Sequence, residues 1–300
     1  MKSFVGTNTE ASGTEDRYPS RVGDKPVIIE RRDPTVYSEW SEDSPLTREQ
    51  SAFYETNGYL FLESFFTDEE IAEWREELRR LQEHYRTRDA KEVIREPGGG
   101  EVRSIFAVHD RNDVFRQAAR HPRLLNIVRY LLGGDVYVHQ SRINYKPGFA
   151  GKEFYWHSDF ETWHVEDGMP AMRALSCSIA LEDNYPFNGP LMVIPGSHRK
   201  FVSCVGRTPE NHFRSSLRKQ EYGVPDPGSL TALVRESGIE TPIGRKGSIV
   251  LFDCNIMHGS NSNITPYPRS NVFIVYNSVA NKLQAPYSGQ APRPTYIAAR

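Results

Sequence analysis

Two histidines and one aspartate are the residues of this chain whose types and spacing could do chemistry. His157 and Asp159 are separated by a single serine, and His258 follows much later in the chain. Two imidazoles and one carboxylate can hold one face of a ferrous ion and leave the opposite face open, as in non-haem Fe(II) oxygenases. The pattern therefore predicts an iron site and an enzyme that activates oxygen.

The surroundings of these candidate ligands strengthen the interpretation. Residues 154–160 are largely aromatic and look extended, and residues two apart on a strand point to the same side. We therefore expect His157 and Asp159 to face one metal ion from a strand, and His258 to follow a second, buried strand that ends in a turn. Zinc is the rival metal, but hydrolytic zinc sites usually rely on His or Cys with a nearby Glu base. The aromatic surroundings favour an oxidant.

Arg269 suggests a second component of the site. It comes shortly after His258, just before another apolar run. A planar guanidinium matches a carboxylate with two charge-assisted hydrogen bonds. We therefore expect Arg269 to clamp the far carboxylate of a 2-oxo acid cosubstrate, with Ser260 as a second partner. Three side chains on one face of a predicted strand could complete the polar wall of a pocket: Gln140, Arg142 and Asn144.

Local signals predict helices in the first half of the chain and strands in the second. Capping boxes at Thr47 and Thr67 each open a helix, and apolar residues at helical spacing extend the second helix over 68–86. Pro122 and Gly133 bracket another helix. Strands are expected at residues 59–62, 136–146, 174–181, 191–194, 248–252 and 271–278. This order predicts a mainly β fold with flanking helices around a double-stranded β-helix, a jelly-roll or cupin-like core.

Four segments define the expected organisation of the chain. Residues 1–16 are expected to be a disordered leader because they are rich in Thr, Ser, Gly and Glu, and residues 17–300 to form a single domain. Residues 25–46 contain several prolines and should wrap the surface irregularly. Residues 203–240 are polar with little periodicity, which suggests a lid or binding loop.

Composition and charge exclude several classes of protein. The net charge is −2 without a basic patch, which argues against nucleic acid as a partner. No apolar run approaches the roughly 18 residues that span a bilayer, and the N-terminus lacks the apolar core of a signal peptide. The three cysteines, Cys177, Cys204 and Cys254, form no Cys-x-x-Cys pair. Reduced thiols in a cytoplasmic protein are the simplest interpretation.

A longer segment carries a family resemblance. Residues 154–170, FYWHSDFETWHVEDGMP, resemble the signature segment of ectoine hydroxylases, which belong to the phytanoyl-CoA dioxygenase-like group of Fe(II)/2-oxoglutarate oxygenases. The similarity continues through residues 195–198 and 258–260 to Arg269 and covers about residues 17–295. It implies a cytoplasmic homodimer that uses Fe(II), 2-oxoglutarate and O2 to convert ectoine to 5-hydroxyectoine, with release of succinate and CO2. Such an enzyme would serve compatible-solute biosynthesis under osmotic stress.

The resemblance also implies which residues meet each small molecule. Iron would be held by His157, Asp159 and His258. The 2-oxoglutarate contacts would come from Arg142, Asn144, Lys146, Phe154, Ser260 and Arg269. The ectoine contacts would come from Gln140, Thr162, Trp163, Ser176, Phe252, Asn271 and Phe273. Trp163 could hold the delocalised cationic ring by cation–π attraction. Asp159 favours hydroxylation, because related halogenases replace this carboxylate with a small residue.

Three other functions remain open at this point. One is a related 2-oxoglutarate hydroxylase that acts on another small amine, amino-acid-like or acyl-CoA substrate. The second is a metal-dependent hydrolase or isomerase on a similar barrel, whose reaction would not need oxygen. The third is a non-catalytic solute-binding barrel, in which His157→Ala would leave ligand affinity largely intact.

Overall fold

The computed structural model describes residues 16–96, 100–216 and 222–300, so the predicted leader lies almost wholly outside the described residues. The helices are α1 (Arg48–Asn57), α2 (Asp68–Tyr85), α3 (Val108–Arg111), α4 (Asp113–Ala119), α5 (Pro122–Leu132), α6 (Asp159–Thr162), the π-helix η1 (Trp163–Asp167), the 3-10 helix η2 (Ser197–Arg199), α7 (Phe213–Ser216) and α8 (Pro227–Ser237). The strands are β1 (Val27–Glu30), β2 (Tyr59–Leu62), β3 (Val93–Arg95), β4 (Val102–Phe106), β5 (Val136–Lys146), β6 (Phe154–His157), β7 (Ala174–Ala180), β8 (Leu191–Val193), β9 (Lys200–Ser203), β10 (Ile249–Asp253), β11 (His258–Ser260) and β12 (Arg269–Ser278).

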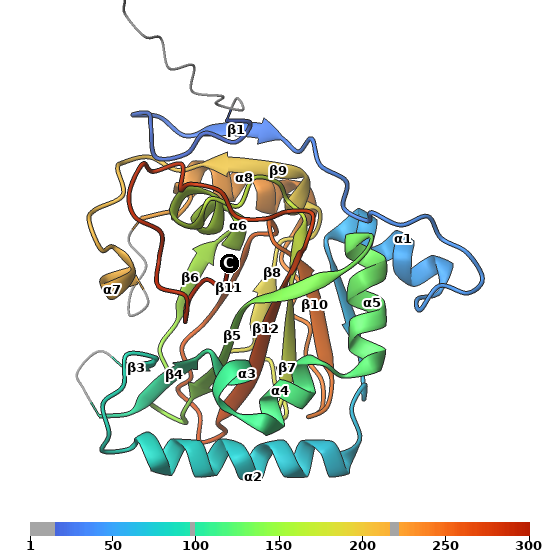
Figure 1. The fold of residues 1–300 in the computed structure, drawn as a ribbon, viewed down its shortest axis with the longest axis vertical. Coiled ribbons are helices and arrows are strands. Elements are labelled where there is room, and N and C mark those ends of the chain that lie inside the picture. Colours follow the sequence, from blue (N-terminus) through green and yellow to red (C-terminus); the bar gives the residue numbers. More distant parts are fainter. Residues whose placement is uncertain (1–15, 97–99, 217–221) are drawn as a thin grey trace, which may run out of the picture.

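These elements form a mixed α/β structure with antiparallel sheets. The large sheet has the strand order β2-β10-β7-β12-β5-β4-β3, and a smaller one has the order β6-β11-β8. Strands β1 and β9 pair separately. In Figure 1, α2 runs across one end of the molecule, α5 flanks the strands, and β1 with β9 lies at the opposite end. No described helix combines the length and apolar character that spanning a bilayer requires.

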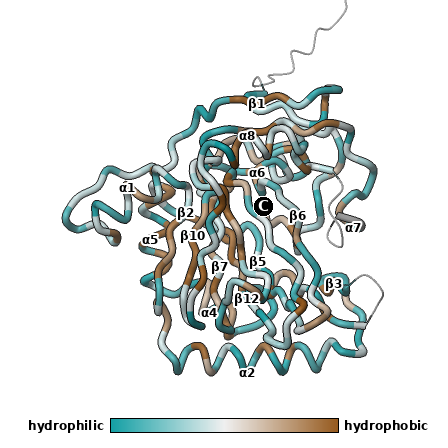
Figure 2. The backbone as a smooth tube through the Cα atoms, turned by 180° about the vertical axis from the view of Figure 1, so that it is seen from behind, coloured by the Kyte–Doolittle hydropathy of each residue, from teal (hydrophilic) through white to brown (hydrophobic). Residues whose placement is uncertain are grey.

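The large sheet has two chemically different faces. Along β12, Val272 and Ile274 point to one face and Asn271 and Phe273 to the other, because side chains alternate along a strand. The apolar face packs against α2, α4 and α5, and Figure 2 shows hydrophobic segments gathered along these strands. Its core includes Trp74, Leu78, Phe115, Leu124, Ile127, Leu131, Ile143, Cys177, Ile179, Leu251, Val272 and Ile274. The helices thus cover one face and leave the other for the site.

Most predicted helix ends are confirmed. Thr47 and Thr67 both form complete capping boxes, in which each threonine hydroxyl accepts from the backbone N–H three residues on. Pro122 begins α5, and Gly133 ends it in a left-handed conformation. The strands predicted at 59–62, 136–146, 174–181, 191–194, 248–252 and 271–278 match observed ones to within two residues at each end.

Two segments predicted as irregular are more ordered than expected. Residues 25–46 contain β1, which pairs with β9. Residues 203–240 contain α8, whose N-cap Asp226 accepts from the backbone N–H groups of Gly228 and Ser229. This helix was not predicted; the role of 203–240 as a lid or binding loop stays a prediction, and residues 217–221 lie outside the described residues. Pro227 and Gly228 resemble loop residues, but proline is well tolerated at the first position of a helix.

The backbone of Gly58 lies so close to the side chain of His198 that no larger residue would fit there. It ends α1 with a φ of 76°, and an added Cβ would collide with the imidazole of His198. Gly289 is a matched control, since its φ is +72° but no atom lies within 4 Å of an added Cβ. We expect Gly58→Ala to lower the free energy of unfolding by roughly 2–5 kcal/mol, from backbone strain plus overpacking. Gly289→Ala should cost only about 1–2 kcal/mol. Urea denaturation checks this, and equal losses would contradict the proposed collision.

Candidate metal centre

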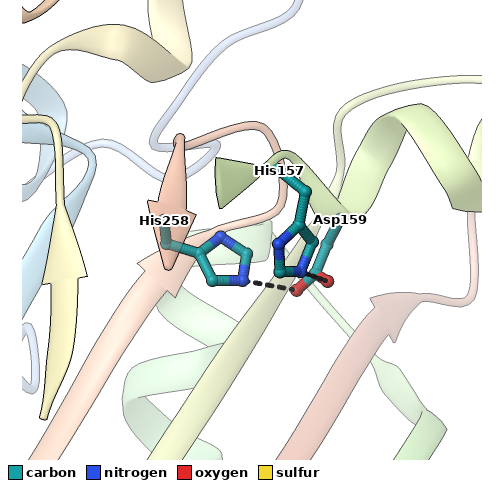
Figure 3. Close-up of side chains that lie close together, drawn as sticks. All are labelled: His157, Asp159 and His258. Carbon is teal, nitrogen blue, oxygen red and sulfur yellow. Dashed lines mark ion pairs between the residues drawn. The ribbon is translucent and has the colours of Figure 1, made fainter. Parts of the chain in front are cut away.

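The three predicted metal ligands meet at the junction of the small sheet and α6. His157 is the last residue of β6, Asp159 is the first residue of α6, and His258 is the first residue of β11. Strands β6 and β11 pair with His258 directly opposite His157. Figure 3 shows the three side chains directed at one point.

The distances between these side chains suit a single ion. Nε2 of His157 lies 3.7 Å from Oδ1 of Asp159, and Nε2 of His258 lies 3.9 Å from Oδ2. One ligand atom from each residue lies within 4.8 Å of the others. Metal bonds of about 2.0–2.2 Å separate neighbouring ligands by about 3 Å. Small side-chain rotations therefore bring all three onto one ion, and the residues present fit iron.

One detail of the predicted geometry is wrong. Asp159 does not lie on the strand with His157, because β6 ends at His157 and Asp159 opens a helix. Ser158 between them keeps an extended backbone, with φ −104° and ψ 129°. The two side chains therefore still converge, although Asp159 is outside the sheet.

Both imidazoles are oriented by backbone carbonyls. Nδ1 of His157 lies 2.7 Å from the carbonyl oxygen of Tyr155, and Nδ1 of His258 lies 3.0 Å from that of Ile256. A carbonyl oxygen can only accept, so each Nδ1 carries the proton and each Nε2 presents a lone pair to the metal. Burial, together with the nearby His258, lowers the pKa of His157 to about 4. His157 is therefore neutral at pH 7, as a metal ligand must be.

The third ligand is held as a carboxylate. Burial alone would raise the pKa of Asp159, but the two imidazoles, Arg142 and the Ser176 hydroxyl together hold it below its usual value. Ser176 donates to Oδ2 of Asp159 at 3.1 Å. Ser176 therefore contacts a metal ligand, a role that the sequence did not suggest.

Two buried basic side chains lie together on the polar face of the large sheet. Arg269 on β12 lies opposite Lys146 on β5 in the register of the two strands. The Arg269 guanidinium donates to the carbonyl of Gly189 at 3.0 Å, its Nε has no partner, and among the described residues no carboxylate forms a salt bridge with it. Burial lowers its pKa to about 10. Lys146 donates to the Ser260 hydroxyl at 2.8 Å and to the Asn261 carbonyl at 2.5 Å. This uncompensated positive charge suits an anion, such as the far carboxylate of a 2-oxo acid.

The pKa of Lys146 makes anion binding sensitive to pH. Burial and the neighbouring Arg269 and Arg103 lower this pKa to about 6, so the ligand-free amine is largely neutral at pH 7.5. A bound dicarboxylate favours the charged amine and raises its pKa, so binding takes up protons. We expect uptake of up to about one proton per 2-oxoglutarate at pH 7.5, and weaker binding as the pH rises above 6. Calorimetry in buffers of different ionisation enthalpy measures this uptake. Lys146→Met should abolish it, and unchanged uptake in that variant would assign the proton to another group.

Of the remaining residues predicted for the cosubstrate, Phe154 lies beside Lys146, whereas Asn144 and Arg142 lie further along β5. Phe154 stacks under Arg103, whose Cζ is 3.9 Å from the ring centroid, and Lys146 lies 5.6 Å from the same ring. Asn144 accepts from the Ser104 hydroxyl at 2.7 Å. The guanidinium of Arg142 lies 5.2 Å from the ring of Phe273, and its Nε is buried without a partner. Arg103 was not predicted, because its contact with Phe154 joins strands far apart in the sequence.

Most residues predicted to meet the substrate share this face. The pairing places Asn271 opposite Asn144, Phe273 opposite Arg142, and Phe252 opposite Ser176. The amide of Asn271 donates to Ser178, while its oxygen is buried without a partner. Gln140 donates to the carbonyl of Ile297 at 2.8 Å, which brings the C-terminal segment against the site; Figure 1 shows the C-terminus near β6 and β11.

Thr162 and Trp163 do not lie on these strands but in the helical segment after Asp159. Trp163 is buried and makes an edge contact with His139, with ring centroids 5.2 Å apart. Thr162 accepts from Arg21 at 3.3 Å. No described contact joins either residue to the other predicted substrate residues, so their role stays a prediction.

The sequence reasoning missed a buried ionic network behind α6 and η1. Arg21 forms a two-pronged pair with Glu161 and a further bond to Glu166 at 2.6 Å. Asp167 pairs in the same way with Arg293. These pairs connect the N-terminal and C-terminal segments to the helix that carries the metal ligand. Their partners are more than a hundred residues apart, so no local pattern could have found them.

Comparisons with known proteins agree with this geometry. A family model described as phytanoyl-CoA dioxygenase (PhyH) matches residues 54–271. The ectoine dioxygenase of Bordetella parapertussis is 56% identical over 289 residues, which cover 96% of this chain and 94% of the relative. The crystal structure of EctD from S. alaskensis with 2-oxoglutarate and 5-hydroxyectoine has a TM-score of 0.87 at 48% identity, with 95% of each chain covered. The same enzyme with bound Fe has a TM-score of 0.85 at 47% identity, covering 95% of this chain and 94% of that one. The resemblance inferred from the sequence is confirmed: the chain belongs to the phytanoyl-CoA dioxygenase (PhyH) family and is similar to its ectoine dioxygenases over nearly its whole length.

Proposed function

We propose that this protein is an Fe(II)- and 2-oxoglutarate-dependent dioxygenase that hydroxylates ectoine to 5-hydroxyectoine, with release of succinate and CO2. The observation that carries the proposal is the convergence of His157, Asp159 and His258, together with the buried basic side chains of Arg269 and Lys146, which form no salt bridge among the described residues. A hydrolytic metal site would not need a buried arginine at this position that no described carboxylate neutralises. The relatives named above supply the substrate.

Each group of residues has a definite task in this reaction. Iron, when bound, supplies oxygen activation coupled to oxidative decarboxylation of 2-oxoglutarate. His157, Asp159 and His258 would hold it on one face and leave the other face for the cosubstrate and oxygen. Arg269 and Lys146 would neutralise the far carboxylate of 2-oxoglutarate and fix its orientation.

The substrate side of the site has both polar and aromatic character. Phe252 and Phe273 lie close together, with ring centroids 6.5 Å apart, and would exclude water from the reacting C–H bond. The unpaired oxygen of Asn271 is a hydrogen-bond acceptor for the ring N–H of ectoine. We assign Gln140, Thr162, Trp163 and Ser176 to the same substrate by their resemblance to the family pattern. Ser176 would also keep Asp159 in place.

The proposal also covers the fold architecture, the cellular compartment and the oligomeric state. We interpret the sheets β2-β10-β7-β12-β5-β4-β3 and β6-β11-β8 as the two halves of a double-stranded β-helix within one domain at residues 17–300. Cys177, Cys204 and Cys254 are buried free thiols, which supports a reducing cytoplasmic compartment. The resemblance supports a homodimer, which light scattering tests.

One assay tests the function and separates the alternatives. Iron-loaded protein is incubated with ectoine, 2-oxoglutarate and ascorbate, and oxygen is then admitted. We expect a product heavier than ectoine by one oxygen atom, and succinate in equal amount. Succinate without that product would instead support a hydroxylase of another small substrate, and turnover without oxygen would support a hydrolase or isomerase. Ectoine binding that survives His157→Ala, without succinate, would support a solute-binding barrel.

A further inference from the structure

Strand pairing does not fix the position of Asp159, the third metal ligand. The two histidines are fixed by strand pairing, since His258 lies opposite His157 across β6 and β11. Asp159 comes after the end of β6 and belongs to no strand. Ser176 orients its carboxylate, but that bond acts on the side chain and not on the backbone.

Two hydrogen bonds, one from a side chain and one from the backbone, anchor the residues on either side of Asp159. The Ser158 hydroxyl donates to Oδ1 of Asn255 at 3.0 Å, and the Phe160 N–H donates to the Cys254 carbonyl at 2.8 Å. Both acceptors belong to the turn between β10 and β11, and His258 follows Asn255 by three residues. The turn that delivers one metal ligand therefore also fixes the segment that delivers another.

Asn255 is itself held rigidly. Its Nδ2 donates to the carbonyls of His198 at 2.9 Å and Lys200 at 3.2 Å. Its backbone N–H donates to Asp253 at 2.8 Å, and Arg31 donates to the same carboxylate oxygen at 2.8 Å. With both amide hydrogens bound to carbonyls, the amide oxygen must face Ser158. Asn255 is 0% exposed, so water does not compete for these bonds.

We infer that Asn255, through its hydrogen bond to Ser158, is a positioning residue that sets the place of Asp159 relative to His258 before a metal ion binds. The bond joins the two distant stretches that carry the ligands. Partners of this kind, which contact ligand-bearing groups and not the ion, typically contribute about 10–100-fold to metal affinity. The inference rests on the metal site of the proposed function but not on its substrate.

Metal affinity of the ligand-free protein tests this inference. Fe(II) is titrated under anaerobic conditions into wild type, Ser158→Ala, Asn255→Ala and the double variant, without 2-oxoglutarate or ectoine. We expect Ser158→Ala to weaken Fe(II) binding about tenfold. We expect the double variant to bind no more weakly than Asn255→Ala, because both changes remove the same bond. Unchanged affinity in Ser158→Ala, or additive effects of the two changes, would overturn the inference.

A matched control separates positioning from general stability. Ser51 also has a buried hydroxyl, which lies 2.7 Å from the hydroxyl of Tyr130, far from the metal centre. Ser51→Ala should lower the thermal midpoint to a similar degree and leave Fe(II) affinity unchanged. An equal loss of affinity in this variant would also overturn the inference. If Asn255→Ala does not fold, Ser158→Ala and this control still decide. Wild type that binds Fe(II) tightly but does not oxidise ectoine would refute the proposed function and leave this inference standing.

Discussion

Asp159→Ala is expected to reduce ectoine hydroxylation by about a thousandfold or more, because a bound metal contributes several kcal/mol to the transition state. The substitution removes the one anionic ligand and leaves only the two imidazoles of His157 and His258. Fe(II) binding should weaken in parallel. Product formation under saturating iron, with anaerobic Fe(II) titration alongside, measures both losses.

Asp226→Ala provides the control for this variant. Asp226 is the N-cap of α8, where it accepts two backbone N–H bonds. Its loss should cost about 1 kcal/mol of stability through the helix end and leave turnover nearly intact. Near-normal hydroxylation by Asp159→Ala would show that the three side chains do not act together on one ion.

Arg269→Leu is expected to stabilise the ligand-free protein while it disables cosubstrate binding. The guanidinium is 5% exposed and lacks a carboxylate partner among the described residues, so its burial costs free energy that leucine would not. The thermal midpoint should therefore rise. The KM for 2-oxoglutarate should increase about 100-fold or more, because two charge-assisted hydrogen bonds contribute roughly 1.5–3 kcal/mol each.

Arg31→Leu is the informative comparison. The side chain of Arg31 is also buried, but its guanidinium pairs with Asp253 at 2.8 Å. Removing Arg31 leaves the buried carboxylate of Asp253 without its ion-pair partner, which typically lowers the free energy of unfolding by about 3–5 kcal/mol. The two leucine variants should therefore move the thermal midpoint in opposite directions, as differential scanning calorimetry would report. A lower midpoint for Arg269→Leu, with unchanged affinity for 2-oxoglutarate, would refute the assigned anion site.

Local chemistry explains which parts of the fold could be predicted from the sequence. The capping boxes at Thr47 and Thr67 involve atoms three residues apart, and strand β5 shows clear alternation, so both follow from nearby residues. The metal ligands could be found because their residue types are chemically distinctive. Arg269 could be expected near the site because it begins an apolar run shortly after His258, and the structure places it in register with Lys146; its role as a carboxylate clamp stays a prediction.

The features that escaped prediction depend on distant partners. The helix that begins at Asp159 is fixed by bonds to the turn at residues 254–255, nearly a hundred positions away. The π-helix η1 and the pairing of Arg21 with Glu161 likewise depend on tertiary contacts. Helix α8 is different, because Asp226 followed by Pro227 is a recognisable helix start. That signal was present in the sequence and could have been used.

Because side chains alternate along β12, the residues on its two faces can change independently: one face contributes to core packing, and the other faces the proposed site. Val272 and Ile274 secure the packing beneath the helices, whereas Asn271 and Phe273, which alternate with them, point to the opposite face, where the substrate is proposed to bind. A change of substrate preference therefore does not have to compromise folding. Engineering that varies every second position of this strand could explore new chemistry on an intact scaffold.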